Sequence, residues 1–235
     1  MSLYKRLILI SLITTLMILA GWIALLLVAD YQADKAENSL KEWRSQQRIP
    51  DEDEWQEANT QINSALKFDP ANPGYLEKLA ELYRWESILN ESTHQERDTA
   101  NRNALKFYRQ LLQLKPSWPN YWGGLVQTKQ ALWEYDNEMN QALQNAAHYG
   151  PWFKNNQRII LRVGYQGWAF LDKETQQTVS GTLERAIKIQ PKQTIQLALN
   201  SGFTDHIMPY LEEDKGLMNW YKREIADRKK KLDSL

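Results

Sequence analysis

Apolar residues form one unbroken run near the N-terminus, and the rest of the chain has a different pattern. Residues 7–29 carry no charged side chain and are rich in Leu and Ile. A helix over these 23 residues would be about 34 Å long, enough to cross a hydrocarbon core of about 30 Å. No polar stripe interrupts the run, which argues against a helix buried in a soluble core. The pattern predicts a cytoplasmic flank and a transmembrane anchor over residues 1–29.

A cleaved signal peptide is the alternative for this run. The apolar region of a signal peptide has about 7–15 residues, and small residues precede its cleavage site. The run in this chain is longer, and Leu27-Val28-Ala29 fits the small-x-small rule poorly. We therefore favour an uncleaved, single-pass anchor.

The charges on either side of the run predict its orientation. Lys5 and Arg6 precede it without any acid, and the flank after it opens with Asp30, Asp34, Lys35 and Glu37. The positive-inside rule places the N-terminus in the cytoplasm and the remaining 206 residues outside it. The chain has no cysteine, which suits a domain exported to an oxidising bacterial periplasm. We expect a bacterial inner-membrane protein whose C-terminal domain is periplasmic.

Beyond the run, apolar residues recur at the spacing of helices, and no convincing alternation typical of strands appears. One helical face joins Trp55, Ala58, Ile62, Ala65 and Leu66, and a second joins Leu76, Leu79, Ala80, Leu82 and Tyr83. An amphipathic stretch is followed closely by a proline at Pro70, Pro116, Pro151 and Pro191. The pattern predicts an all-α fold, with a helical membrane-proximal linker over 30–49 and a repeat domain over 50–235.

Small and large residues also recur at positions typical of the tetratricopeptide unit, a helix–turn–helix of about 34 residues. The residues that carry this resemblance are Ala65, Pro70, Leu76, Leu79, Ala80, Tyr83, Ala104, Tyr108, Leu111, Pro116, Trp122, Leu125, Ala186 and Pro191. The resemblance implies an α-solenoid of about four helix pairs, since each pair buries its apolar face only against its neighbours. About twelve additional residues between Tyr83 and Ala104 predict a lengthened turn.

A more specific resemblance lies in residues 142–188. This segment combines Gly150-Pro151-Trp152, Gln157, Gly164-Tyr165, Trp168, Leu171-Asp172 and Leu183-Glu184-Arg185-Ala186. It resembles the VpsP-type proteins, which are small bacterial membrane-anchored proteins associated with exopolysaccharide biosynthesis. The layout of an anchor followed by helical repeats is similar as well. The resemblance implies a role in making or exporting a surface polysaccharide, and it implies no catalytic residue.

The composition argues against several classes of function. Lys plus Arg and Asp plus Glu number 29 each, so no net basic charge is available to neutralise the phosphates of a nucleic acid. Without cysteine there is no thiol nucleophile, Cys-based zinc site or iron–sulfur cluster, and the three histidines lie far apart. We therefore expect no cofactor, no metal site and no enzymatic activity.

Polar residues on the first helices of two consecutive repeats predict a partner-binding groove. They are Glu77, Glu81, Arg84, Asn120, Gln127 and Gln130. The alternative is that they only face solvent, as polar residues of any amphipathic helix do. A carboxylate pair such as Glu77 and Glu81 is also found in glycosidases, but a water-exposed acid has no reason for a raised pKa.

Three further features offer weaker candidate contacts. Trp118 and Trp152 stand beside prolines at turns, where an exposed ring contacts a glycan or a partner, although most neighbouring aromatic residues should belong to the core. The basic tail, with Lys222, Arg223 and residues 228–231, is either a solvated end or a contact for anionic polysaccharide or lipid. The acidic run 51–54 is interpreted as a helix cap rather than a cation site.

These features together predict a non-enzymatic scaffold of exopolysaccharide biosynthesis or export. It would dock proteins of a polysaccharide assembly machine through a helical-repeat surface outside the cytoplasm. The alternative is a tetratricopeptide assembly factor for cytochrome maturation or for another envelope complex.

Overall fold

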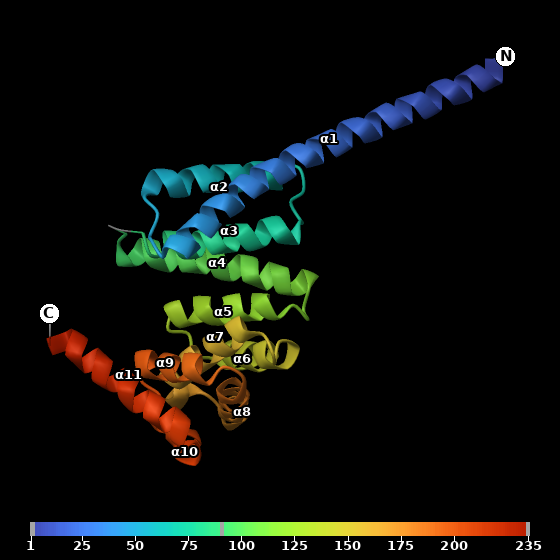
Figure 1. The fold of residues 1–235 in the computed structure, drawn as a ribbon. Helices are drawn as coiled ribbons and strands as arrows, with labels where there is room; N and C mark the ends of the chain where they lie inside the picture. The colour runs from blue at the N-terminus through green and yellow to red at the C-terminus, as the bar shows by residue number, and fades with distance from the viewer. Residues whose placement is uncertain (1–2, 90–91, 234–235) are drawn as a thin grey trace. The chain divides into compact units, whose positions relative to one another are not determined.

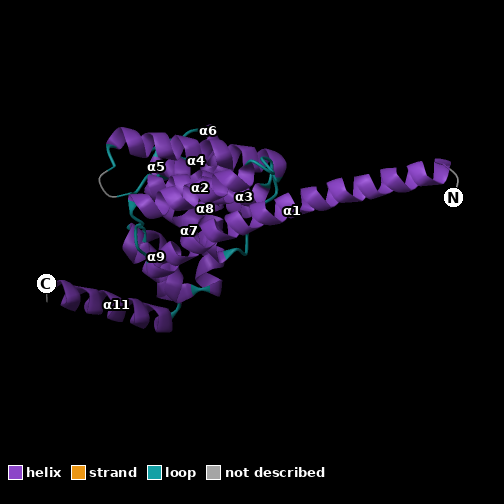
Figure 2. Cartoon of the chain, turned by 90° about the horizontal axis from the view of Figure 1, so that it is seen from above, coloured by secondary structure: helices purple, strands orange, loops and turns teal. Residues whose placement is uncertain are grey.

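In the computed structural model of the protein, residues 3–89 and 92–233 are described. They contain eleven α-helices, one short 3-10 helix and no strand, and Figure 2 shows the helices joined by loops. The expected all-α fold is confirmed. The chain divides into two compact units, Met1–Leu114 and Lys115–Leu235, whereas the sequence pattern predicts a single repeat domain over 50–235.

Unit 1 contains two helix pairs (Figure 1). They are α1 (Leu3–Gln46) with α2 (Glu52–Leu66), and α3 (Pro73–Glu86) with α4 (His94–Leu114). Helix α3 also contacts both helices of the first pair, so the two pairs stack in chain order. This is the packing expected for tetratricopeptide-like repeats, in which each pair covers the apolar face of the next.

Helix α1 has two parts with different surroundings. Its N-terminal part is apolar and exposed, and its length and composition are sufficient to cross a membrane. Its C-terminal part places Ala29, Ala33, Ala36, Leu40 and Trp43 at alternating four- and three-residue spacing, and all five are buried. Figure 1 shows the N-terminal part extending away from the packed helices of unit 1, in line with the packed part of α1.

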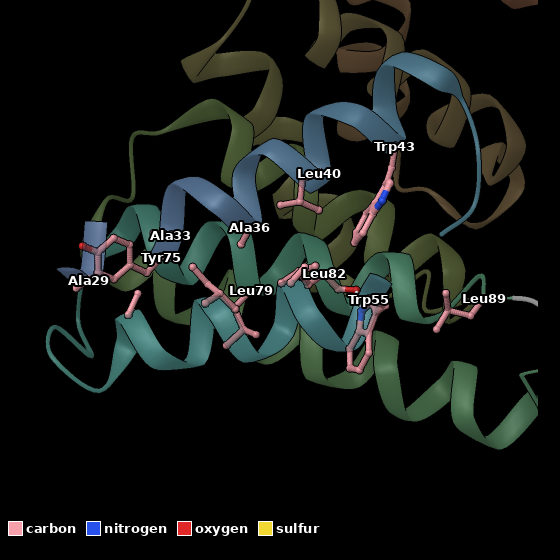
Figure 3. Close-up of a cluster of buried hydrophobic side chains, with 13 residues drawn as sticks. Ala29, Ala33, Ala36, Leu40, Trp43, Trp55, Tyr75, Leu79, Leu82 and Leu89 are labelled. Atoms are coloured by element: carbon pink, nitrogen blue, oxygen red, sulfur yellow. Dashed lines mark hydrogen bonds between the residues drawn. The ribbon is translucent and has the colours of Figure 1, made fainter. Parts of the chain in front are cut away.

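The buried face of α1 belongs to the hydrophobic core of unit 1 (Figure 3). Trp43 packs edge-on against Trp85 of α3, with 5.8 Å between ring centroids. The indole Nε1 of Trp55 in α2 donates a hydrogen bond of 2.8 Å to the carbonyl of Leu82 in α3. Residues 30–46 are therefore a packed helix whose apolar face is covered by α2 and α3, in the stretch where the sequence predicts a helical linker over 30–49.

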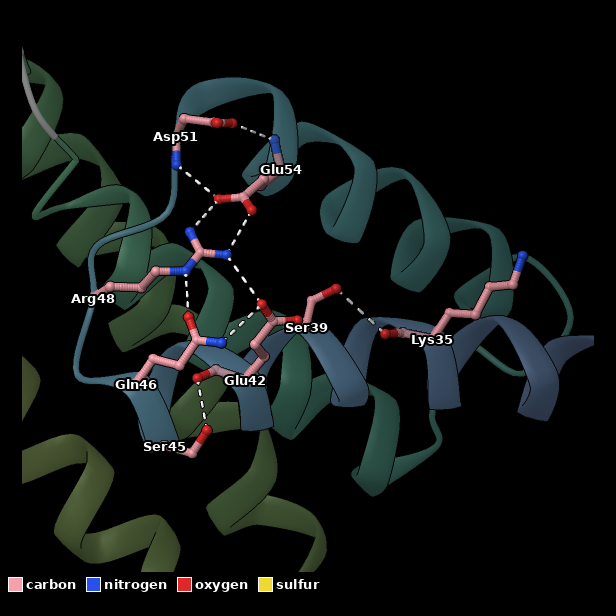
Figure 4. A network of polar contacts seen from close by, with 8 residues as sticks. All are labelled: Lys35, Ser39, Glu42, Ser45, Gln46, Arg48, Asp51 and Glu54. Atoms are coloured by element: carbon pink, nitrogen blue, oxygen red, sulfur yellow. Dashed lines mark hydrogen bonds and ion pairs between the residues drawn. The ribbon is translucent and has the colours of Figure 1, made fainter.

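The turn between α1 and α2 is organised by charge (Figure 4). Gln47 adopts a left-handed φ of 52° that ends α1. Asp51 then caps α2: its carboxylate accepts from the amide of Glu54, and the Glu54 carboxylate accepts from the amide of Asp51. Arg48 donates to both Glu54 oxygens at 2.6 Å and lowers the pKa of that carboxyl. The interpretation of the acidic run 51–54 as a helix cap is confirmed.

Helices α3 and α4 pack together, and small residues of both are buried. Ala80 and Ala104 are both fully buried, and Tyr83 stacks on Phe107 with 5.7 Å between ring centroids. Only some of the additional residues after Tyr83 lie in the turn. The others belong to α4, which is 21 residues long. The prediction of a lengthened turn is therefore only partly right, and residues 90–91 of that turn lie outside the described residues.

Unit 2 contains three further helix pairs and a final helix. They are α5 (Pro119–Ala131) with α6 (Asn137–Tyr149), α7 (Lys154–Gln166) with α8 (Lys173–Ile189), α9 (Pro191–Ser201) with α10 (Thr204–Glu213), and α11 (Lys215–Asp233), with a 3-10 turn at Trp168–Phe170. Helix α7 lies between α5 and α9, and α6 packs against α8. A Cβ on Gly164 would lie 2.5 Å from Val179, so this glycine lets α7 and α8 approach closely.

Candidate functional site

The predicted groove residues of unit 1 lie on α3 and are engaged within the chain. Glu81 accepts hydrogen bonds from Arg44 of α1 at 2.8 and 3.0 Å, and Arg44 also binds Glu37 at 2.8 Å. Burial raises the pKa of the Tyr108 hydroxyl, and a hydrogen bond from Arg84 partly offsets this effect. The surface of α1 and α3 therefore presents a network of internal ion pairs in place of a free set of charges.

The predicted residues of unit 2 lie on α5, and two of them reach the next first helix. Arg162 of α7 donates to the side-chain oxygen of Gln127 at 3.2 Å, and Gln130 donates to Gln166. Asn120 is exposed in the first turn of α5. The structure thus connects the polar face of α5 to that of α7.

A hollow of about 810 Å³ lies between α7 and α9. The lining residues from α7 are Lys154, Asn155, Arg158, Leu161, Arg162 and Gln166. The opposite wall consists of Gln190, just before α9, and of Gln193, Thr194, Gln196, Leu197, Asn200 and Ser201 in α9. Three of these side chains are cationic, and none of the described lining residues is acidic. The hollow is therefore a positively charged site with many amide groups.

Helical periodicity explains why these side chains share one face. Lys154, Arg158 and Arg162 are four residues apart, so they form one stripe along α7. The opposite side of α7 carries Ile160 and Val163, which are buried in unit 2. The sequence prediction of the groove missed this stripe, although the four-residue spacing of basic residues was a usable signal.

The basic tail meets the rim of the hollow. Arg228 of α11 donates a hydrogen bond of 2.7 Å to the side-chain oxygen of Asn200 on α9, and it also binds Glu224 at 3.2 Å. Helix α11 packs against α9, so at least one cation of the tail lies beside the α9 wall.

The two predicted tryptophans occupy the turns that precede α5 and α7. Trp118 is 46% exposed and Trp152 is 66% exposed. The side-chain amide of Asn156 in α7 donates a hydrogen bond of 2.8 Å to the carbonyl of Pro119 in α5, which joins the N-terminal ends of the two helices. Trp152 precedes Lys154 by two residues, so an exposed ring stands at one end of the basic stripe.

The sequence analysis missed Trp133, which is 76% exposed. This residue has a left-handed φ of 56° in the turn between α5 and α6. Its ring lies 6.2 Å from that of Tyr135, which stacks on Phe170 at 5.7 Å. No signal in the sequence separates this exposed ring from its buried neighbours.

An ionic cluster supports the same turn. The ammonium of Lys129 is buried and lies 2.8 Å from Asp136, 2.8 Å from Glu138 and 3.1 Å from Glu134. Within the described part of the chain, no group of three or more His, Cys, Asp or Glu side chains could hold a metal ion. The lysine occupies the centre of these three carboxylates, so we assign them a structural role.

No family model and no curated protein matches the chain. The solved structures that are similar to it include the following two. A thermophilic TPR protein from Thermus thermophilus is 16% identical, covers 81% of this chain and 99% of its own, and gives a TM-score of 0.47. The MamA protein is 15% identical, covers 69% of this chain and 96% of its own, and gives a TM-score of 0.32.

Proposed function

We propose that the protein is a non-enzymatic, membrane-anchored docking protein, and that unit 2 holds an acidic, extended segment of a partner protein between α7 and α9. The observation that carries this proposal is the stripe of Lys154, Arg158 and Arg162 facing the amide groups of α9 across the hollow. Long cations bind carboxylates, and Asn and Gln side chains hydrogen-bond the backbone of an extended peptide.

The charge of unit 2 supports an acidic partner. Residues 115–235 contain 16 basic and 13 acidic side chains. Complementary charge increases the rate of encounter and excludes partners of the wrong sign. Arg228 in the tail adds a cation beside α9, and the basic tail also suits an anionic polysaccharide or lipid. Trp152 offers a ring for an apolar side chain of the partner or for a glycan.

The location of the docking surface follows from α1. We propose that residues 7–29 anchor the protein in a bacterial inner membrane, with Lys5 and Arg6 in the cytoplasm and both units in the periplasm. The exposed apolar part of α1 and the charge bias of its flanks support this orientation. A reporter that is active only in the periplasm should be active when fused after Leu235, and a cytoplasmic signal there would contradict the orientation.

We propose proteins of an exopolysaccharide assembly or export machine as the partners. The support for this client is the similarity of residues 142–188 to VpsP-type proteins, a segment that includes α7 and its basic stripe. The alternative client is a complex of cytochrome maturation or another envelope assembly. The two clients differ in the phenotype that loss of the groove would cause.

A charge-reversal pair tests the groove. In Lys154→Glu with Arg158→Glu, binding of a fluorescein-labelled peptide of alternating Glu and Ala should weaken by about tenfold or more, since two attractions become repulsions. The matched control is Lys188→Glu with Lys215→Glu, which makes the same change of charge at exposed positions outside the hollow. Binding to the unmodified protein should also weaken as salt rises from about 0.05 M to about 0.2 M.

The same two variants identify the client in cells. The groove variant should lose polysaccharide output at an unchanged membrane level, and the control variant should keep it. Normal output with a loss of cytochromes would favour the alternative client. Equal peptide binding by the groove and control variants would contradict the proposed docking site itself.

A further inference from the structure

We infer that unit 1 rests directly on the lipid surface, with the loop between α2 and α3 in the headgroup layer and Phe68 in contact with lipid. This inference rests on the membrane anchor of the proposed function and adds a second contact with the bilayer. The occupant of this surface is the bilayer that α1 itself enters.

The first argument is that no spacer separates the apolar run from unit 1. Ala29 is the last residue of the run, and it is also fully buried in the core of unit 1. Helix α1 continues without a break from Leu3 to Gln46. The last residue of the run is therefore already part of the packed core.

The second argument concerns the level of the loop along α1. The hydroxyl of Tyr75, in the first turns of α3, donates a hydrogen bond to the carboxylate of Asp30. Figure 3 shows Ala29 and Tyr75 together at one end of the cluster, and Figure 1 shows the connection from α2 to α3 at the end from which α1 departs. Residues 67–72 form this connection, so they lie near the level of Ala29.

The third argument is the thickness of the membrane. A span of 23 residues is about 34 Å long, so it exceeds a hydrocarbon core of about 30 Å by only about 4 Å. Each headgroup layer adds about 5–7 Å beyond the hydrocarbon. A loop at the level of Ala29 therefore falls inside the headgroup layer.

The side chains at this level suit that environment. Phe68 is 42% exposed in the loop beside the exposed Lys67. Tyr31 is exposed at the end of the run, and the ammonium of Lys35 lies 4.9 Å from its ring centroid. Aromatic rings and lysines are the residues that membrane proteins concentrate at the bilayer–water boundary.

Acidic residues at the same level decide which lipids are needed. Asp30, Asp34 and Asp69 lie close enough to Tyr75 to raise the pKa of its hydroxyl, after the larger effect of burial. These carboxylates oppose any gain from anionic headgroups. We therefore expect the contact to form on a neutral phosphatidylcholine bilayer.

The absence of cysteine makes a direct test practical. A nitroxide label is attached to single-cysteine variants of the full chain in phosphatidylcholine vesicles, and its accessibility to oxygen is compared with that to a water-soluble nickel chelate. The variants are Phe68→Cys in the loop, Ile49→Cys in the turn at the other end of unit 1, and Leu19→Cys in the apolar run. Phe68 and Ile49 are each 42% exposed, which makes them a matched pair.

We expect labels at positions 19 and 68 to favour oxygen and the label at position 49 to favour the nickel chelate. If position 19 favours oxygen while positions 68 and 49 behave alike, the lipid contact of the loop is wrong and the anchor stands. If position 19 favours the nickel chelate, the anchor of the proposed function fails as well.

A polar heptad inserted between Val28 and Ala29 gives an independent arm. Seven helical residues raise unit 1 by about 10 Å and turn it by only about 20°. The label at position 68 should then become accessible to the nickel chelate, while the thermal unfolding of unit 1 is unchanged. An unchanged accessibility at position 68 in this folded variant would overturn the inference.

Discussion

The hydroxyl of Tyr75 donates a hydrogen bond to the carboxylate of Asp30, 45 residues earlier in the chain. Asp30 is the first residue after the apolar run, and Tyr75 is buried in the second helix pair. The pair therefore joins the end of the apolar run directly to α3. Together with the ion pair of Arg44 and Glu81, it holds α1 against α3 at two levels.

Replacing the Tyr75 hydroxyl tests the hydrogen bond between Tyr75 and Asp30. Tyr75→Phe should lower the free energy of unfolding of unit 1 by about 1.5 kcal/mol, the lower end of the range for a hydrogen bond to a charged group, because Asp30 is exposed. Thermal unfolding of the full chain in detergent micelles measures the change. A variant as stable as the unmodified protein would mean that the pair contributes nothing to the packing of α1.

The role of α1 in the core is tested by comparing two leucines. Leu40 is fully buried, so Leu40→Ala should cost about 2–5 kcal/mol through lost burial and the cavity that remains. Leu27 lies in the exposed apolar part of the same helix, so Leu27→Ala should leave the unfolding of unit 1 unchanged. Equal effects of the two substitutions would contradict the division of α1 into an anchor part and a core part.

The ionic cluster in unit 2 predicts a dependence of stability on pH. Burial alone would lower the pKa of Lys129, and hydrogen bonds to Asp136, Glu138 and Glu134 more than offset it, so the pKa is raised above 10.5. The pKa of Asp136 is lowered below 3.8, because Lys129 and the Met139 amide outweigh burial. The attraction between Lys129 and its carboxylates is largest where the ammonium and the carboxylates are both charged. The cluster therefore stabilises unit 2 between about pH 4 and about pH 10.

Lys129→Met should therefore cost about 2 kcal/mol at neutral pH, less than the loss of a fully buried pair, because the three carboxylates are partly exposed. The cost should shrink as the pH falls below about 4, where the carboxylates of both proteins take up protons. Chemical denaturation across this range measures it. A cost that is constant with pH would show that packing of the lysine stem, and not its charge, is the source.

For Glu86 we expect ionisation to destabilise the fold, whereas the charges around Lys129 stabilise it. Burial raises the pKa of Glu86 to about 7, and the charges of Glu52 and Glu96 add to the effect. Its buried Oε2 has no hydrogen-bond partner among the described residues. Since the folded state holds this proton more tightly than the unfolded state, the group lowers stability as the pH rises from about 4.5 to about 7.

Glu86→Gln should therefore stabilise unit 1 by about 1 kcal/mol at about pH 8 and have almost no effect at about pH 4, below the pKa of Glu86 in both states. Denaturant unfolding at the two pH values measures the difference. Glu57→Gln, an exposed acid on α2, is the control and should change stability at neither pH. A gain of equal size at both pH values would contradict the role of the charge.

Local sequence patterns were sufficient for the class of fold and for several helix ends. The spacing of apolar residues predicts helices throughout, and the capping box of Asp51 and Glu54 could be inferred from four consecutive acids. Ala80 and Ala104, two small residues of the repeat pattern, are both buried. These features depend on residues close together in the chain, so a single sequence contains the necessary information.

Only the tertiary structure decided how these helices are used. Helix α1 contains both the exposed apolar run and part of the core, because α2 and α3 cover its face with Ala33, Ala36 and Leu40. Nothing in the sequence of α1 identifies the helices that cover this face. Glu81, expected in an open groove, is paired with Arg44 from 37 residues away. The basic stripe of α7 is visible in the sequence, but its position opposite the amides of α9 results from packing between helices. Contacts at such separations are chosen by the burial of whole faces, which a local pattern does not specify.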